Sequence, residues 1–328
     1  MSLARSHLPM SGDDSSERMC PVSVVVPAYN AESTIDGAVQ SLLRQQYPRG
    51  CFEIIVVENG SRDRTQSLLT RYGQDIRVVH EKKQGAAAAR NAGIRVASFP
   101  HIAFTDADCV PDPSWLRELM AYAGRHPRCD FIGGPILAYQ PRSPMERFSE
   151  SLWDQDRALR DRPPYAITAN LLVRRTLLLE LGLFDETFLR GQDVDLSYRA
   201  YLRGARFGYA AAAIVRHVNP RTLWQVFAKG LQHGRAVVGV LEKYSRELGQ
   251  TPWQRCRDGC RYASIGGHMV RIMRGGWRRQ PELMSLSLFH AVFESGKQLG
   301  VWRDTVMRAP GRIGLRRQNH GELSGRAP

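Results

Sequence analysis

The sequence predicts an α/β fold with a mostly parallel central sheet, followed by a basic helical region. Short apolar runs alternate with helix-like stretches between residues 21 and 110, as in successive βαβ units. Polar residues gather where each predicted strand ends. Positive charge is concentrated late in the chain, because residues 221–328 carry 19 Lys and Arg against 7 Asp and Glu.

Composition sets the outer limits of the prediction. The chain has 328 residues, 43% of them hydrophobic, which is enough for a large core. No apolar run reaches the roughly 18 residues of a membrane-spanning helix. Residues 1–20 lack the apolar middle of a secretory signal, so we expect a disordered leader and a cytoplasmic protein. The six cysteines form no CxxC pair, which favours reduced thiols.

The first 110 residues contain four predicted strands rich in β-branched residues, typical of a buried parallel sheet. These strands cover residues 22–26, 52–57, 76–80 and 101–105. Predicted helices over residues 33–46, 61–72 and 84–96 lie between them. Ligands of such sheets bind beyond the carboxyl ends of the strands. The polar clusters at those ends should therefore converge on one crevice; they are Tyr29-Asn30, Glu58-Asn59 and Asp106-Ala107-Asp108.

Residues 111–220 are less regular. We expect helices over 115–124 and 193–202, strands over 131–134, 168–173 and 207–215, and a helix ending at 181. Residues 140–165 are rich in Pro, Arg and Asp and predict an irregular or helical insertion over the crevice. Further helices are expected over 223–244, 255–273 and 283–301, and a disordered tail over 309–328.

Four features carry candidate chemistry, and each has a structural alternative. Asp106 and Asp108 at a strand mouth can share a divalent cation, or form a solvated turn. Asp193 can serve as a general base, or cap a helix in whose first turn negative charge is favoured. His217 can bind a metal or a diphosphate, or be structural. Gly85 and Arg90 suit diphosphate binding, or belong to an ordinary Ala-rich helix.

Five ordered motifs together resemble glycosyltransferase family 2. The run from Val22 to Glu32 is similar to the family's opening strand and nucleotide loop, and the run from Ile54 to Thr65 to its VVDDGSxDxT motif. Residues 89–93 match ARNxG and residues 104–108 match the DxD strand. Residues 182–186 and 192–196 resemble the GxFDE and EDxDL pair.

The resemblance implies a GT-A fold, an inverting mechanism and a divalent metal, Mn²⁺ or Mg²⁺. It implies a catalytic domain over 21–220, with a nucleotide-binding half (21–110) and an acceptor-side half (111–220), before a helical basic region (221–308). Residues implied to bind the nucleotide-sugar are Pro27, Ala28, Tyr29, Glu32, Glu58, Asn59, Gly85, Arg90, Asp106 and Ala107. Those implied on the acceptor side are Gln192, Asp195 and Gly134. Asp193 would be the base, and Asp108 and His217 the metal ligands.

Two departures from the family pattern bear on activity. Glu58-Asn59 replaces the common Asp-Asp but keeps an acid at the first position, where the base of the donor is read. Gln192 replaces the usual Glu before Asp193, so a catalytically silent nucleotide-sugar-binding protein is the alternative to an active transferase.

The basic C-terminal third predicts a surface partner. Residues 221–328 mix arginines with Trp224, Trp277 and other aromatic residues, a composition suited to the plane of an anionic bilayer. We therefore expect a peripheral position on the inner face of the cell membrane and a saccharide or lipid-linked acceptor. The alternatives are helices packed on the catalytic domain and a membrane adaptor. No nucleic-acid motif is present, so we expect no nucleic-acid partner.

Overall fold

The computed structural model describes residues 20–148, 150, 152–188, 190–244 and 281–307. The chain divides into two compact units after Arg221, and each is described by itself. The predicted leader, tail and helix over 255–273 lie outside the described residues.

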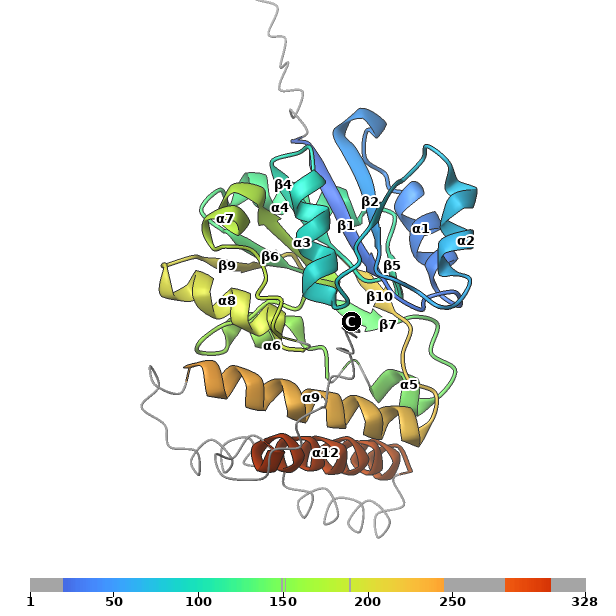
Figure 1. The fold of residues 1–328 in the computed structure, drawn as a ribbon, viewed down its shortest axis with the longest axis vertical. Coiled ribbons are helices and arrows are strands. Elements are labelled where there is room, and N and C mark those ends of the chain that lie inside the picture. The colour runs from blue at the N-terminus through green and yellow to red at the C-terminus, as the bar shows by residue number, and fades with distance from the viewer. Residues whose placement is uncertain (1–19, 149, 151, 189, 245–280, 308–328) are drawn as a thin grey trace, which may run out of the picture. The chain divides into compact units, whose positions relative to one another are not determined.

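The first unit is built on a seven-stranded mixed sheet with the strand order β3-β2-β1-β4-β8-β6-β9 (Figure 1). Its strands are β1 (Val22–Ala28), β2 (Phe52–Glu58), β3 (Arg77–His80), β4 (His101–Phe104), β6 (Phe131–Gly133), β8 (Leu171–Arg174) and β9 (Phe207–Tyr209). Neighbouring strands are parallel except where β8 pairs with β4 and β6. The predicted α/β class with a mostly parallel sheet is confirmed.

Helices cover both faces of this sheet (Figure 1). The helices of this unit are α1 (Ile35–Leu43), α2 (Thr65–Leu69), α3 (Ala86–Val96), α4 (Trp115–Arg125), α5 (Pro144–Phe148), α6 (Gln155–Arg160), α7 (Arg175–Glu180) and α8 (Gln192–Leu202). Alternate residues of a strand point to opposite faces. Val24 accordingly joins a core cluster with Ile35 of α1, whereas Val25 joins another with Ile94 of α3. The helices are held by these two apolar layers.

A second, three-stranded sheet was not predicted. Its order is β5-β10-β7, from β5 (Cys109–Pro111), β10 (Val215–His217) and β7 (Ile136–Ala138). The prediction of one strand over 207–215 is wrong, because residues 207–209 and 215–217 form separate strands in different sheets. Strands of three residues are too short for side-chain alternation to reveal them. This small sheet brings His217 alongside Cys109.

The second unit contains two long helices, α9 (Leu223–Tyr244) and α12 (Pro281–Met307). They run parallel, because Gly230 lies against the Phe293 carbonyl and Gly234 against the Lys297 carbonyl, four residues further along both helices. Glycine is needed at both places: a Cβ would come within 2.0 Å of the carbonyl oxygen. Within the described ranges, no helix is both long and apolar enough to cross a bilayer.

Candidate active site

The carboxyl ends of β1, β2 and β3 meet at one edge of the large sheet. Ala28 pairs with Glu58, and Glu58 with His80, at the last position of each strand. β4 adjoins β1, so Asp106 follows just beyond Phe104 at the same edge. The predicted convergence of the strand-end clusters therefore follows from the register.

The loops after β1 and β2 are joined into one surface. Asn30, in a left-handed conformation (φ 48°), accepts a hydrogen bond from the Arg62 backbone N–H at 2.8 Å. Glu32 accepts one from the Arg64 N–H at 3.1 Å. Between the strand end Pro27-Ala28 and this junction, Tyr29 is 47% exposed. A half-exposed aromatic side chain thus lies directly after the carboxyl end of β1.

Glu58 is buried and ionised. Its Oε1 accepts the Ser61 N–H at 2.5 Å, and its Oε2 lies 3.4 Å from Nδ1 of His80. Burial by itself would raise the pKa of Glu58, but hydrogen bonds from Ser61 and Gly60 outweigh it and lower the pKa. The site therefore holds an acceptor-only group at neutral pH.

Asn59 organises the loop that leads into α3. Its amide donates to the carbonyls of Glu81 and Lys83, at 2.9 and 2.8 Å, and accepts the Gly85 N–H at 2.8 Å. Gly85 is the N-cap residue of α3 with φ 135°, a conformation that other residues rarely adopt. Asn59 thus fixes the backbone of the loop between β3 and α3 rather than presenting a free side chain.

Arg90 contacts residues from two motifs that lie far apart in the sequence, Asp106 and Phe184. Its guanidinium is 4% exposed, donates to Oδ1 of Asp106 at 2.6 Å, and lies 5.8 Å from the ring centre of Phe184. Its Nε and Nη1 are buried, with no hydrogen-bond partner among the described residues. Unpaired buried donors are costly, so these two point to a ligand.

Phe184 is carried by a loop bound to the same helix. Asn91, next to Arg90, donates to the Phe184 carbonyl and accepts the Phe184 N–H, both at 2.9 Å. Its Nδ2 is also 2.8 Å from Glu186. The two motifs at 89–93 and 182–186 are thus bound to each other in the structure. Their separation of about 90 residues gave no sign of this contact in the sequence.

Asp193 lies in the first turn of α8, after Gly191 in the left-handed region. Burial raises its pKa, Arg90 opposes that shift, and Asp106 adds to it. Arg90, Asp106 and Asp193 are therefore electrostatic neighbours. Gln192 is buried, and its Oε1 has no partner in the described part of the chain.

Two predicted acceptor-side residues serve the framework. Asp195 is fully buried and bound to Arg199 at 2.8 Å and 3.0 Å, an i,i+4 pair. Gly134 is packed where a Cβ would meet the Ala213 carbonyl at 2.2 Å. Among the donor-side residues, Ala107 is likewise buried in the core between the two acids.

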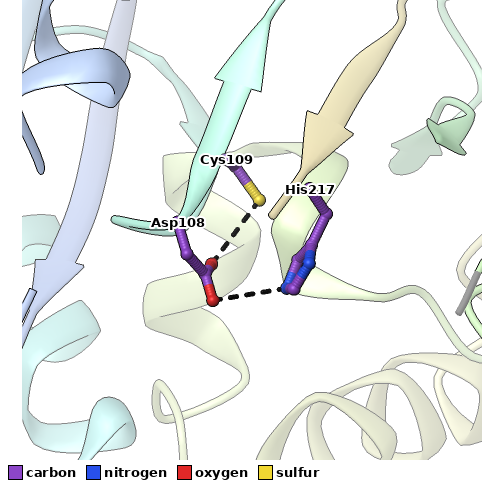
Figure 2. A group of neighbouring side chains, drawn as sticks. All are labelled: Asp108, Cys109 and His217. Carbon is purple, nitrogen blue, oxygen red and sulfur yellow. Dashed lines mark hydrogen bonds and ion pairs between the residues drawn. The ribbon is translucent and has the colours of Figure 1, made fainter. Parts of the chain in front are cut away.

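Asp108, Cys109 and His217 form a compact group with metal-ligand chemistry (Figure 2). Nε2 of His217 lies 3.4 Å from Oδ2 of Asp108. Burial raises the pKa of Cys109 well above its ordinary value, so it is a thiol in the metal-free protein. One carboxylate and one imidazole remain, and they fit a divalent cation.

A separate cavity of about 420 Å³ lies against α1 and the small sheet. Val110 and Arg216 line it, and they alternate with Cys109 and His217 along their strands. Ala138, the register partner of His217, also lines it, whereas Asp108, Cys109 and His217 do not. This cavity is distinct from the crevice at the strand ends.

Comparison with known proteins agrees with this geometry. Residues 23–182 match the family model described as glycosyl transferase family 2. Glycosyltransferase AglE of Haloferax volcanii is 30% identical over 226 residues, which cover 67% of this chain and 73% of that protein. The chain belongs to glycosyltransferase family 2. It is a glycosyltransferase of a family that inverts the anomeric centre.

Other members of family 2 match over a smaller part of their length. Validoxylamine A glucosyltransferase of Streptomyces hygroscopicus subsp. limoneus is 28% identical, over 61% of this chain and 50% of that protein. Pre-mycofactocin glycosyltransferase of Mycobacterium tuberculosis is 31% identical, over 65% and 46%. This chain spans about half the length of these two relatives.

Solved structures confirm the GT-A fold. Mannosyltransferase PcManGT from Pyrobaculum calidifontis, in complex with GDP-Man and Mn²⁺, has a TM-score of 0.59 at 17% identity over 86% of this chain and 87% of that chain. S. aureus TarS 1–349 has a TM-score of 0.52 at 18% identity, over 87% and 91%. At such identity the likeness shows the fold alone.

Proposed function

We propose that this family 2 enzyme moves a sugar from a nucleoside-diphosphate sugar to a hydroxyl of a saccharide or lipid-linked acceptor. The observation that carries the proposal is the contact of Arg90 with Asp106 beyond the end of β4, with Asp193 near enough for both charges to act on its carboxyl group. Solved relatives contain UDP-GlcNAc or GDP-Man, which supports this donor class.

The nucleoside would lie over the joined loops after β1 and β2. Tyr29 offers an exposed ring beside Pro27 and Ala28. The ionised carboxylate of Glu58 can accept an N–H of the base, and Glu32 holds the second loop in place. Gly85, positioned by Asn59, lets the start of α3 approach the diphosphate closely.

Asp108 and His217 would hold a divalent cation, Mn²⁺ or Mg²⁺. The bound cation would offset the negative charge that develops on the leaving diphosphate. The two unpaired N–H groups of Arg90 are free to donate to oxygens of the donor. Asp106 orients that guanidinium through their 2.6 Å contact.

Asp193 would take the proton from the acceptor hydroxyl. Its raised pKa makes the ionised carboxylate a better base than that of an exposed aspartate. The neighbouring Gln192 can accept a hydrogen bond from the acceptor through its unpaired Oε1. Asp195 and Gly134 would support this side through the framework.

The test compares Asp193→Asn with Asp75→Asn, the same change at an exposed position. UDP-, GDP- and dTDP-sugars are screened with Mn²⁺ for release of the nucleoside diphosphate, with and without acceptor extracts. We expect Asp193→Asn to lose at least about 10²-fold in turnover and to keep the thermal shift produced by donor. Normal turnover by Asp193→Asn would remove the assigned base.

The second unit would dock on an anionic membrane surface at the cytoplasmic face. Leu288, Leu299 and Trp302 of α12 are exposed and fall on one side of the helix. Trp224 at the start of α9 is 72% exposed. Residues 221–328 carry a large excess of positive charge, which complements anionic lipid.

Vesicle sedimentation tests this docking. The full chain should bind phosphatidylglycerol vesicles and bind pure phosphatidylcholine weakly, and Trp224→Ala with Trp302→Ala should bind less. Leu202→Ala, at an exposed apolar residue of α8, is the control. Equal binding to both lipids, or no effect of the tryptophan changes, would contradict docking through these side chains.

A further inference from the structure

The buried imidazole of His217 is held from the side opposite Asp108. His217 is 6% exposed, and its Nδ1 lies 2.9 Å from Oδ1 of Asn219. Its Nε2 lies 3.4 Å from Oδ2 of Asp108. The ring of Trp153 packs on the imidazole, with 5.8 Å between ring centres. The ring orientation is therefore fixed from several directions.

The amide of Asn219 can face His217 in one way only. Its Nδ2 donates to the backbone carbonyl of Glu146 at 2.6 Å. If the amide were turned over, its Oδ1 would face this carbonyl oxygen, and neither oxygen carries a hydrogen to donate. Oδ1 must then face the imidazole, where it can only accept. Nδ1 of His217 is thus the protonated nitrogen.

The partner carbonyl is itself anchored. The Glu146 carboxylate accepts the Arg142 N–H at 2.7 Å and pairs with Nε of Arg221 at 3.1 Å. Asn219 is 7% exposed, so water does not compete readily for these contacts. A chain of hydrogen bonds runs from α5 through Asn219 to His217.

We propose that Asn219 is a positioning residue for the metal centre. By accepting a hydrogen bond from the Nδ1–H of His217, Asn219 leaves the Nε2 lone pair facing Asp108, so imidazole and carboxylate present two electron-pair donors to one cation. Outer partners of this kind fix the tautomer and orientation of a ligand histidine. The inference rests on the metal site in the proposed function but concerns a residue outside every motif used to find it.

The first test needs no metal. Nitrogen-15 NMR of the metal-free full-length protein, with His217→Ala to assign the signals, should show His217 protonated at Nδ1. Asn219→Leu should lose that preference, whereas Asn219→Asp, which keeps an acceptor, should retain it. Protonation at Nε2 in the wild type would overturn the proposal even if no variant folded.

The second test measures Mn²⁺ binding by loss of the free-ion EPR signal, with UDP and with GDP in separate titrations. Asn219→Leu should bind Mn²⁺ about 10- to 100-fold more weakly, and Asn219→Asp should bind more tightly than Asn219→Leu. If Asn219→Leu binds Mn²⁺ as tightly as the wild type while His217→Ala binds it more weakly, the role of Asn219 is overturned and the metal site stands. Wild-type affinity in His217→Ala instead removes the metal site itself.

Discussion

The guanidinium of Arg90 holds the carboxylate of Asp106 at 2.6 Å inside the first unit, with Arg90 almost entirely buried. A buried charge pair is kept only where its other polar groups find partners, and two N–H groups of Arg90 have none among the described residues. The pair is thus better suited to a ligand than to stability alone.

Arg90→Gln should therefore reduce kcat/KM by about 10²- to 10³-fold, the scale of losing one placed charge-stabilising donor. Donor affinity should also fall, as measured by the thermal shift with nucleotide-sugar. Arg95→Gln, on the same helix and 54% exposed, is the control. Activity of Arg90→Gln within twofold of that control would show that the guanidinium has no part in transfer.

Gly93, the last residue of the ARNxG motif, is explained by packing. A Cβ there would lie 2.5 Å from Cγ1 of Val25. Alanine improves helix propensity by about 1 kcal/mol, but overpacking costs about 1–3 kcal/mol. Gly93→Ala should thus lower the free energy of unfolding in urea, whereas Gly124→Ala, with open space around it, should not. Equal effects would contradict this reading of the motif.

The acidic residues at the strand ends could be predicted because long buried strands are recognisable in the sequence as apolar, β-branched runs. β1 and β2 are largely apolar strands of seven residues, so the position of Glu58 followed from where β2 stops, and Asp106 lies just beyond the four-residue strand β4. A register shared by parallel neighbours then brings such ends together. The predicted convergence required no knowledge of side-chain contacts.

The other parts of the candidate site could not be predicted in this way, because they depend on contacts between residues far apart in the sequence. His217 reaches Asp108 through a sheet of three-residue strands, and Asn219 acts through a carbonyl 73 residues away. Asp195 is different, because Arg199 follows it by four residues, and this spacing of an ion pair on a helix is visible in the sequence. That spacing could have marked it as structural.

Asp193 should make stability depend on pH. A folded-state pKa above the unfolded value means that the protonated form is favoured by folding. The associated stability is present below the unfolded pKa and is lost as pH rises through the folded pKa. At pH 7 this carboxyl group therefore costs stability, and Asp193→Asn should melt at a higher temperature than the wild type.

This difference should shrink as pH falls and close below the unfolded pKa, where both side chains are neutral. Melting curves of the two proteins between about pH 3 and pH 8, a range that starts below the unfolded pKa of aspartate, measure it, with Asp75→Asn as the surface control. A wild type that melts above Asp193→Asn at neutral pH would mean that the carboxylate is stabilised by folding, against the direction given by burial.

The parallel helices α9 and α12 depend on close contact between their backbones. Gly234 lies against the Lys297 carbonyl, and Gly300 against the Leu231 carbonyl, where a Cβ would approach within 2.0 and 2.3 Å. Arg235 and Asp304 add an ion pair at 3.2 Å across the same contact. Any larger side chain must push the helix axes apart, because both obstacles are backbone.

Gly234→Val should consequently separate the helices and lower the melting temperature of the helical signal in circular dichroism. Gln232→Val is the matched control, since it places the same β-branched residue at an exposed position of α9 and removes no interhelical contact. Its cost should be limited to helix propensity, below about 1 kcal/mol. If Gly234→Val and Gln232→Val have the same melting temperature, the close backbone contact at Gly234 does not stabilise the packing of α9 on α12.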